Sequence, residues 1–148
     1  MPRARPLDLG PLVTIIGFVL RRAQLVVYAD FLRDAPVPLT PGQLGVLVVI
    51  EHNPEMMQQD LCEAIGVDKS TFTSTLDGLA DRKLIRRVRS REDRRRNSLR
   101  LTAKGKGALQ AMLVHVARHE ERVFARLSRS ERTQLMKLLR KVAAGGLE

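Results

Sequence analysis

The positive charge of this chain is concentrated in one segment, and the most basic part of that segment must be solvated. Residues 82–106 hold twelve of the 26 lysines and arginines and only two of the 16 acidic residues, so they account for the whole net charge of +10. Within this segment, the charged run Arg89–Arg96 separates two strand-like stretches, one at Leu84–Val88 and one at Ser98–Leu101. The pattern predicts a β-hairpin with a solvated basic tip, which suits a polyanionic partner.

Two short helices joined by a glycine-containing turn are predicted before this hairpin. The amphipathic stretch Met57–Ile65 is followed by Gly66, which suits the left-handed position after a helix. Asp68 is positioned to cap a second helix that runs to Leu79, with apolar residues on one face and small hydroxyl residues on the other. A helix-turn-helix followed by a basic hairpin is the arrangement of a winged helix, a DNA-binding fold.

The first helix is predicted over Asp8–Arg33 and is apolar on nearly every side. Residues Leu9–Leu20 include no charged side chain, and a helix of this kind must be covered all round. One small domain cannot cover it, so we expect a homodimer. Twelve uncharged residues are too few to span a bilayer, and no small-residue cleavage site follows them.

Capping signals mark two further helices. Thr40 and Pro41 supply an N-cap and an N1 proline for a helix ending near His52. Thr102 is expected to cap a helix that extends to Leu127, about 25 residues and so roughly 37 Å long. A helix that extends beyond its own domain usually packs on a partner subunit.

The last helix begins at a predicted capping box of Ser128 and Glu131. Because aromatic residues make up only 3% of the chain, its core must be aliphatic, which favours packed helices. We therefore predict a mainly α-helical fold with a small β wing, in which residues 1–34 and 103–148 form dimerisation helices and residues 35–102 form the DNA-binding lobe. The residues predicted at the dimer interface are Leu12, Val13, Ile16, Leu135, Leu138, Leu139 and Val142.

Catalytic motifs are not evident in the sequence. It contains no Walker loop, no dinucleotide-binding fingerprint after a strand, no nucleophile elbow and no HExxH. We therefore expect neither an enzyme nor a bound cofactor. The single cysteine, Cys62, excludes an internal disulfide and suits the reducing cytoplasm.

Three alternatives to a ligand-controlled regulator stay open. His115 and His119, spaced i and i+4, would form part of a metal sensor, although two histidines without a third ligand more often line an interface or pocket. Cys62 would be a redox sensor, yet its apolar position is typical of a buried thiol. An architectural DNA-binding protein would show little sequence preference. A membrane-surface protein is disfavoured because the hairpin tip has no bulky apolar residue.

The chain contains the motifs Leu76-Asp-Gly-Leu79, Leu84-Ile85, and Asp93-Arg-Arg95 followed by Leu99-x-Leu-Thr-x-x-Gly105. Together these motifs resemble those of the winged-helix repressors of the multiple-antibiotic-resistance regulator (MarR) family. The resemblance covers about residues 8–144. It implies a homodimer that places two winged helices on successive major grooves of a pseudo-palindromic operator. It also implies an effector pocket between the dimerisation helices and the DNA-binding lobe, for phenolic compounds, aromatic carboxylates or, in some relatives, their coenzyme A (CoA) thioesters.

The resemblance also assigns roles to single residues. It implies that Arg95 enters the minor groove and that Asp93 orients it. Lys83 stands where relatives usually have glycine, so it must either adopt a positive φ or reshape the helix end. The residues predicted to contact DNA are Lys69, Ser70, Thr71, Thr73, Ser74, Arg87, Arg91, Arg94, Arg95 and Arg96. Those predicted from position to bind the effector are Phe18, Arg22, Leu47, Met112 and His115, with Arg22 pairing a carboxylate or phosphate.

Overall fold

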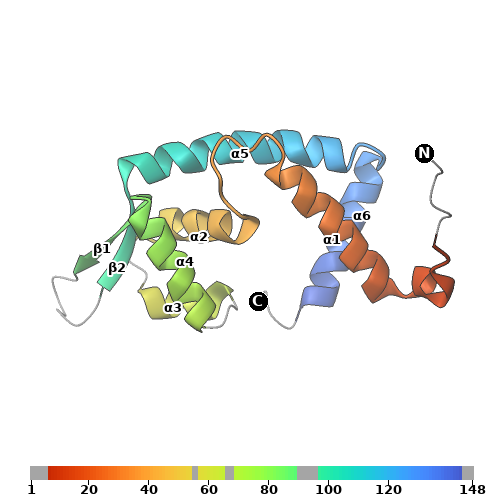
Figure 1. Cartoon of the computed structure of the whole chain (residues 1–148), viewed down its shortest axis with the longest axis horizontal. Coiled ribbons are helices and arrows are strands. Elements are labelled where there is room, and N and C mark those ends of the chain that lie inside the picture. The colour runs from red at the N-terminus through yellow and green to blue at the C-terminus, as the bar shows by residue number, and fades with distance from the viewer. Residues whose placement is uncertain (1–6, 55–56, 66–68, 90–96, 145–148) are drawn as a thin grey trace.

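The predicted mainly helical fold with a small two-stranded sheet is confirmed by the computed structural model, which describes residues 7–54, 57–65, 69–89 and 97–144 (Figure 1). The chain order is η1 (Gly10–Thr14), α1 (Ile16–Leu32), α2 (Pro41–His52), α3 (Gln58–Ile65), α4 (Lys69–Asp81), β1 (Ile85–Arg89), β2 (Asn97–Leu101), α5 (Ala103–Val123) and α6 (Arg129–Ala143).

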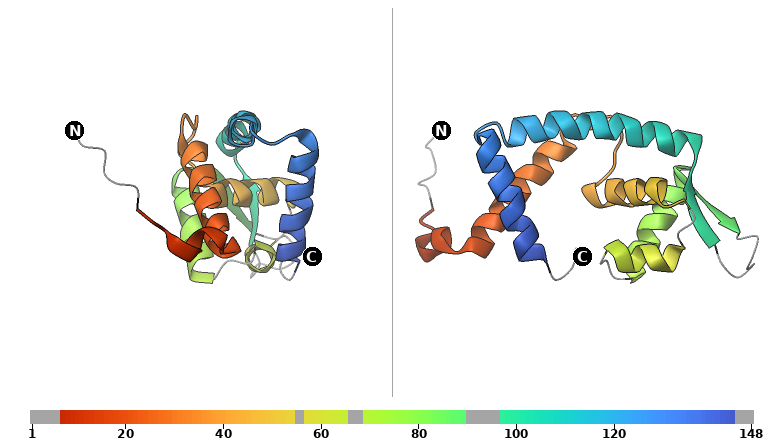
Figure 2. Two further views of the ribbon diagram at one scale, coloured as in Figure 1. Left: turned by 90° about the vertical axis from the view of Figure 1, so that its right-hand side faces the viewer. Right: turned by 180° about the vertical axis from the view of Figure 1, so that it is seen from behind.

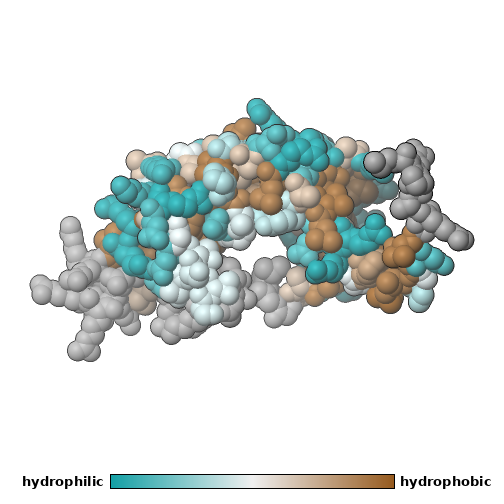
Figure 3. Space-filling model, viewed as in Figure 1, coloured by the Kyte–Doolittle hydropathy of each residue, from teal (hydrophilic) through white to brown (hydrophobic). Residues whose placement is uncertain are grey.

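The long helix α5 joins two lobes. At its N-terminal end lie α2, α3, α4 and the two-stranded sheet, and at its C-terminal end lie α1 and α6 (Figures 1 and 2). Both α1 and α2 pack on α5. The space-filling view shows an opening below α5 between the two lobes (Figure 3). The fold therefore separates a candidate DNA-binding lobe from a lobe that lacks its own closed core.

The buried core lies mainly in the DNA-binding lobe. The apolar residues Phe72, Leu76 and Leu79 of α4 are almost fully buried, as their helical spacing predicts. They pack in one cluster with α2, the sheet and the first half of α5. In contrast, η1 and α6 contribute no buried residue to the described part of the chain.

The predicted first helix is broken near its start. Residues Gly10–Thr14 form a 3₁₀ helix, and Ile15 is extended with φ −85° and ψ 113° before α1 begins. Pro11 favours such a short turn, and the Thr14 hydroxyl donates a 2.8 Å hydrogen bond to the Pro11 carbonyl. The prediction of one continuous helix over Asp8–Arg33 was therefore wrong at this point.

The long helix ends four residues earlier than predicted. It stops at Val123 rather than Leu127 because the chain turns back there into α6. Arg132 of α6 satisfies carbonyls at this turn, since its Nε donates to the oxygens of Phe124 at 3.1 Å and Leu127 at 3.3 Å. An arginine from the following helix thus closes the end of α5.

The predicted N-caps at Thr40, Thr102 and Ser128 are confirmed, whereas Gly66 and the predicted cap Asp68 lie outside the described residues. The Thr40 hydroxyl accepts a hydrogen bond from the Gln43 amide, and the Gln43 side chain accepts one from the Thr40 amide. Ser128 and Glu131 form the same reciprocal box at α6. The Ser128 hydroxyl and the Ser128 amide both donate hydrogen bonds to the Glu131 carboxylate, and they hold the pKa of Glu131 below its usual range.

Candidate DNA-binding surface

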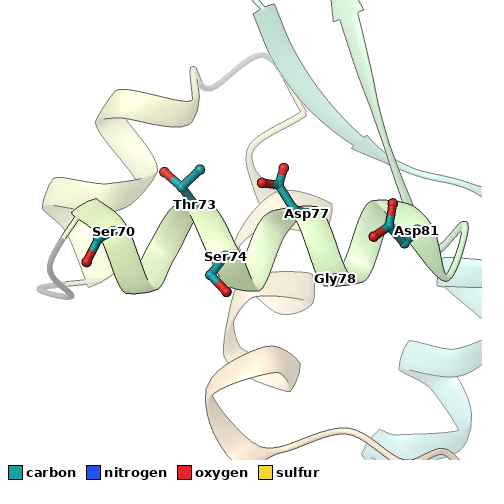
Figure 4. A pocket seen from close by; sticks show the side chains of 6 residues that line it. All are labelled: Ser70, Thr73, Ser74, Asp77, Gly78 and Asp81. Atoms are coloured by element: carbon teal, nitrogen blue, oxygen red, sulfur yellow. The ribbon is translucent and has the colours of Figure 1, made fainter.

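Helix α4 presents a small, polar face away from the core. Ser70, Thr71 and Ser74 are exposed there, and Thr73 is half-buried. A shallow hollow runs along this face, lined by Ser70, Thr73, Ser74, Asp77, Gly78 and Asp81. Figure 4 shows these residues along the helix, from Ser70 at the N-terminal end to Asp81 at the C-terminal end. The four hydroxyl residues predicted to contact DNA therefore share one helix; the Lys69 side chain lies outside the described part.

An acidic residue that the sequence reasoning missed lies on the same helix. The Asp77 carboxylate forms a 2.6 Å ion pair with the Arg87 guanidinium of β1. Arg87 is among the residues predicted to contact DNA, but in this structure its charge is engaged by Asp77. The pair ties the wing to α4. The signal was present in the sequence, because Asp77 belongs to the Leu76-Asp-Gly-Leu79 motif.

The wing is a two-stranded antiparallel sheet. Its register runs from Ile85 opposite Leu101 to Arg89 opposite Asn97. Ile85, Leu99 and Leu101 are buried, which fixes the sheet on the lobe. The tip residues Arg91, Asp93, Arg94, Arg95 and Arg96 lie outside the described residues, so their roles stay predictions.

The end of α4 uses a left-handed residue that is not glycine. Lys83 has φ 58°, so of the two alternatives for this position the chain adopts the positive φ. Its amide donates to the Ala80 carbonyl at 2.8 Å, and the Leu84 amide donates to the Leu79 carbonyl at 3.0 Å. This is the Schellman arrangement, with Lys83 at the position where glycine is commonest.

The Thr-x-x-Gly part of the motif connects the wing to α5. The Thr102 hydroxyl accepts from the Gly105 amide at 3.0 Å and donates to the Lys83 carbonyl at 2.6 Å. A Cβ atom at position 105 would lie 1.9 Å from the Leu84 carbonyl oxygen. Only glycine allows this close approach of α5 to the residue that precedes β1.

The two histidines of α5 are buried against the end of α1. His115 Nε2 donates to the Phe31 carbonyl at 2.7 Å, and His119 Nδ1 lies 2.9 Å from Asp30 Oδ2. Arg122 also reaches Asp30, at 3.0 Å. The hydrogen bond from His119, followed by that from Arg122, holds the pKa of Asp30 below its usual range.

Both histidines are therefore engaged in contacts with α1. Within residues 7–54, 57–65, 69–89 and 97–144, no three histidine, cysteine or acidic side chains gather as a metal site. Cys62, the candidate redox residue, is half-buried and packs against the core. In the same ranges, no helix is both long and apolar enough to cross a bilayer.

The five residues predicted to bind an effector differ in burial and in the lobe to which they belong. Leu47 and Met112 are fully buried in the core, and His115 lies one turn from Met112 on α5. Phe18 is half-buried and Arg22 is exposed, one turn apart on α1. The structure thus places two of these residues in a closed core and two on the other lobe.

Sequence comparison assigns the family. The MarR family profile matches residues 37–96. A Thauera aromatica protein described as a transcriptional regulatory protein for the hcr operon is 36% identical over 135 residues, which cover 90% of this chain and 81% of that protein. This chain belongs to the MarR family. The transcriptional repressor NicR of Pseudomonas putida, another relative of this MarR protein, is 30% identical over 144 residues, covering 95% and 91% of the two chains.

Solved structures agree with this assignment. The repressor CouR bound to a 23-mer DNA duplex is 40% identical, with a TM-score of 0.87 over 94% of this chain and 99% of CouR. CouR bound to p-coumaroyl-CoA is 38% identical, with a TM-score of 0.86 over 93% and 98% of the two chains. The chain is therefore a transcriptional regulator of MarR type, and its matched relatives are named as regulators rather than enzymes.

Proposed function

We propose that this regulator is a homodimeric repressor that leaves its operator when it binds an aromatic acid or the CoA thioester of one. The observation that carries the proposal is the exposed hydroxyl face of α4 beside a wing that Asp77, Thr102 and Gly105 hold in place. A helix of this kind reads base edges in the major groove, and a basic wing contacts the backbone and minor groove.

The exposed apolar surface supports a homodimer. Ile16 is 83% exposed in the single chain and Val142 is 79% exposed, and Figure 3 shows apolar side chains gathered over η1 and α1. Large apolar side chains gathered in this way on water-exposed helices mark an interface. All seven residues predicted at the dimer interface are at least partly exposed: Leu12, Val13, Ile16, Leu135, Leu138, Leu139 and Val142.

The CouR structures support the proposal of two binding partners, DNA and an aromatic effector. One is of CouR with DNA and the other of CouR with p-coumaroyl-CoA. In this chain, the opening below α5 lies between the DNA-binding lobe and α1 (Figure 3). We place the effector there, against Phe18, Arg22 and His115. An effector that prefers a conformer with displaced recognition helices lowers DNA affinity by its differential affinity for the two conformers.

Fluorescence anisotropy tests the proposal. The unmodified protein is titrated onto a duplex selected from a random-sequence pool, and onto a scrambled duplex, with and without p-coumarate and p-coumaroyl-CoA. We expect at least a thousandfold preference for the selected duplex, and release by an aromatic acid or its thioester. Equal affinity for both duplexes would favour an architectural protein. Selective binding that neither compound relieves would contradict the proposed aromatic effector but would still support a sequence-specific DNA-binding regulator.

A further inference from the structure

We propose that one face of α6 is a second phosphate-binding surface, which contacts the DNA backbone between the two recognition helices of a dimer. This inference rests on the proposed homodimer. The surface consists of Arg129, Lys137, Arg140 and Lys141, and we call it the α6 basic face. It lies outside the basic segment 82–106 that the sequence analysis identified.

Helix α6 carries a charge that the whole-chain balance conceals. It holds five basic residues and one acidic residue, while the chain outside residues 82–106 is neutral. The acidic residue, Glu131, is engaged in the capping box, and Arg132 is bound to Glu121 at 2.9 Å. The four residues of the α6 basic face are exposed and make no side-chain hydrogen bond or ion pair with any other described residue.

Helical geometry separates this basic face from the apolar face of α6. Arg129, Met136 and Arg140 are spaced seven and four residues apart, so they lie on one side of the helix, and Lys137 adjoins them. A shallow hollow on this side is lined by Arg132, Thr133, Met136, Lys137 and Arg140. The apolar residues Leu135, Leu138, Leu139 and Val142 follow the i, i+3, i+4, i+7 rule on the other side. A partner subunit that covers the apolar side leaves the basic side exposed.

The position of α6 in the fold favours DNA as the occupant. The C-terminal end of α6 and the N-terminal end of α4 lie on the same side of α5 in all three views (Figures 1 and 2). In a dimer, the two α6 helices lie between the two DNA-binding lobes. A duplex that spans both recognition helices must pass this region, and it presents one negative charge per 1.7 Å or so of its axis.

The first measurement is the salt dependence of DNA binding. The double variant Lys137→Gln/Arg140→Gln is compared with Arg118→Gln/Arg126→Gln, which removes the same charge at exposed positions on α5 and the turn after it. We expect the slope of log affinity against log salt to fall by about 3.6 units in the α6 variant, because the dimer loses two phosphate contacts from each subunit at about 0.9 units each. The control slope should not change.

A second duplex locates the contact. On a short duplex with a single half-site and no central spacer, the α6 variant and the control should bind with the same slope. Sedimentation velocity verifies that both remain dimeric. If the double variant dimerises less tightly, Arg140→Gln alone replaces it, with an expected fall of about 1.8 units, one contact from each subunit.

Three results would overturn the inference. The first is a slope for the α6 variant equal to that of the control on the full duplex. The second is an equal loss on the half-site duplex, which would show a general electrostatic effect. The third is an unchanged slope with lost response to p-coumaroyl-CoA, which would assign the surface to the effector's phosphates. Failure of the unmodified protein to select any duplex, or to dimerise, would instead contradict the proposed function.

Discussion

At the scale of single residues, Gly105 shows how a short motif connects two elements. The Leu84 carbonyl occupies the space that a side chain at position 105 would need, and the same oxygen accepts a 3.0 Å hydrogen bond from the Thr102 amide. The last glycine of the wing motif is therefore required by packing rather than by its backbone conformation.

The substitution Gly105→Ala should lower the free energy of unfolding by about 1–3 kcal/mol, because the α5 backbone must move away from Leu84. Urea denaturation at fixed protein concentration measures this. Gly107→Ala is the matched control, since nothing lies within 4 Å of a Cβ atom there, and it should stabilise the helix by about 0.5–1 kcal/mol. Equal behaviour of the two variants would contradict the packing explanation.

The Asp77–Arg87 pair gives a second prediction at this scale. Because Asp77 already engages Arg87, Arg87→Gln should leave the salt slope of DNA binding unchanged. In an Asp77→Asn background the guanidinium is released, and the same substitution should then lower the slope by about two units, one for each subunit of the dimer. Anisotropy titrations of the four proteins decide the question. A fall of about two units in the unsubstituted background would instead support the direct phosphate contact first predicted for Arg87.

At the scale of elements, the junction of α1 and α5 is held by an ionic cluster centred on Asp30. Asp30 is only 7% exposed and is contacted by His119 and Arg122 from α5. Its lowered pKa means that the ionised form is favoured in the folded protein. This contribution is present above the unfolded pKa of about 4 and is lost as the pH falls through the lower folded pKa.

We expect Asp30→Asn to be less stable than the unmodified protein at neutral pH and to lose less stability below pH 4 or so. Urea denaturation across a pH series measures both effects. Asp34→Asn, at an exposed position beyond the end of α1, should follow the unmodified protein at every pH. Parallel curves for Asp30→Asn and the unmodified protein would show that the cluster makes no pH-dependent contribution.

At the scale of the whole molecule, one lobe is incomplete without a partner. The lobe of η1, α1 and α6 exposes apolar side chains along both helices, whereas the DNA-binding lobe buries its own. Ile16→Glu should therefore weaken dimerisation at least tenfold or so with little loss of helix content, because Ile16 supports no core in the single chain. Sedimentation velocity and circular dichroism test this, with Gln24→Glu as a control for added charge on α1. A dimer as tight as before would place the interface elsewhere.

The sequence by itself determined the order of the elements, their caps and the winged-helix arrangement. Those features depend on signals between near neighbours: the apolar period in α4, the N-cap at Thr40, the capping box at Ser128, and the strands beside the charged tip. The left-handed backbone at Lys83 was one of two possibilities that the sequence raised, and the structure chose between them.

Only the tertiary structure decided which distant groups meet. His119 contacts Asp30 across 89 positions of sequence, and Arg132 of α6 folds back to donate to the carbonyl of Phe124, the C-cap of α5. Leu47 and Met112, predicted to bind an effector, are core residues because α2 packs on α5. Local patterns cannot specify such contacts, since each depends on the packing of helices that are far apart along the chain.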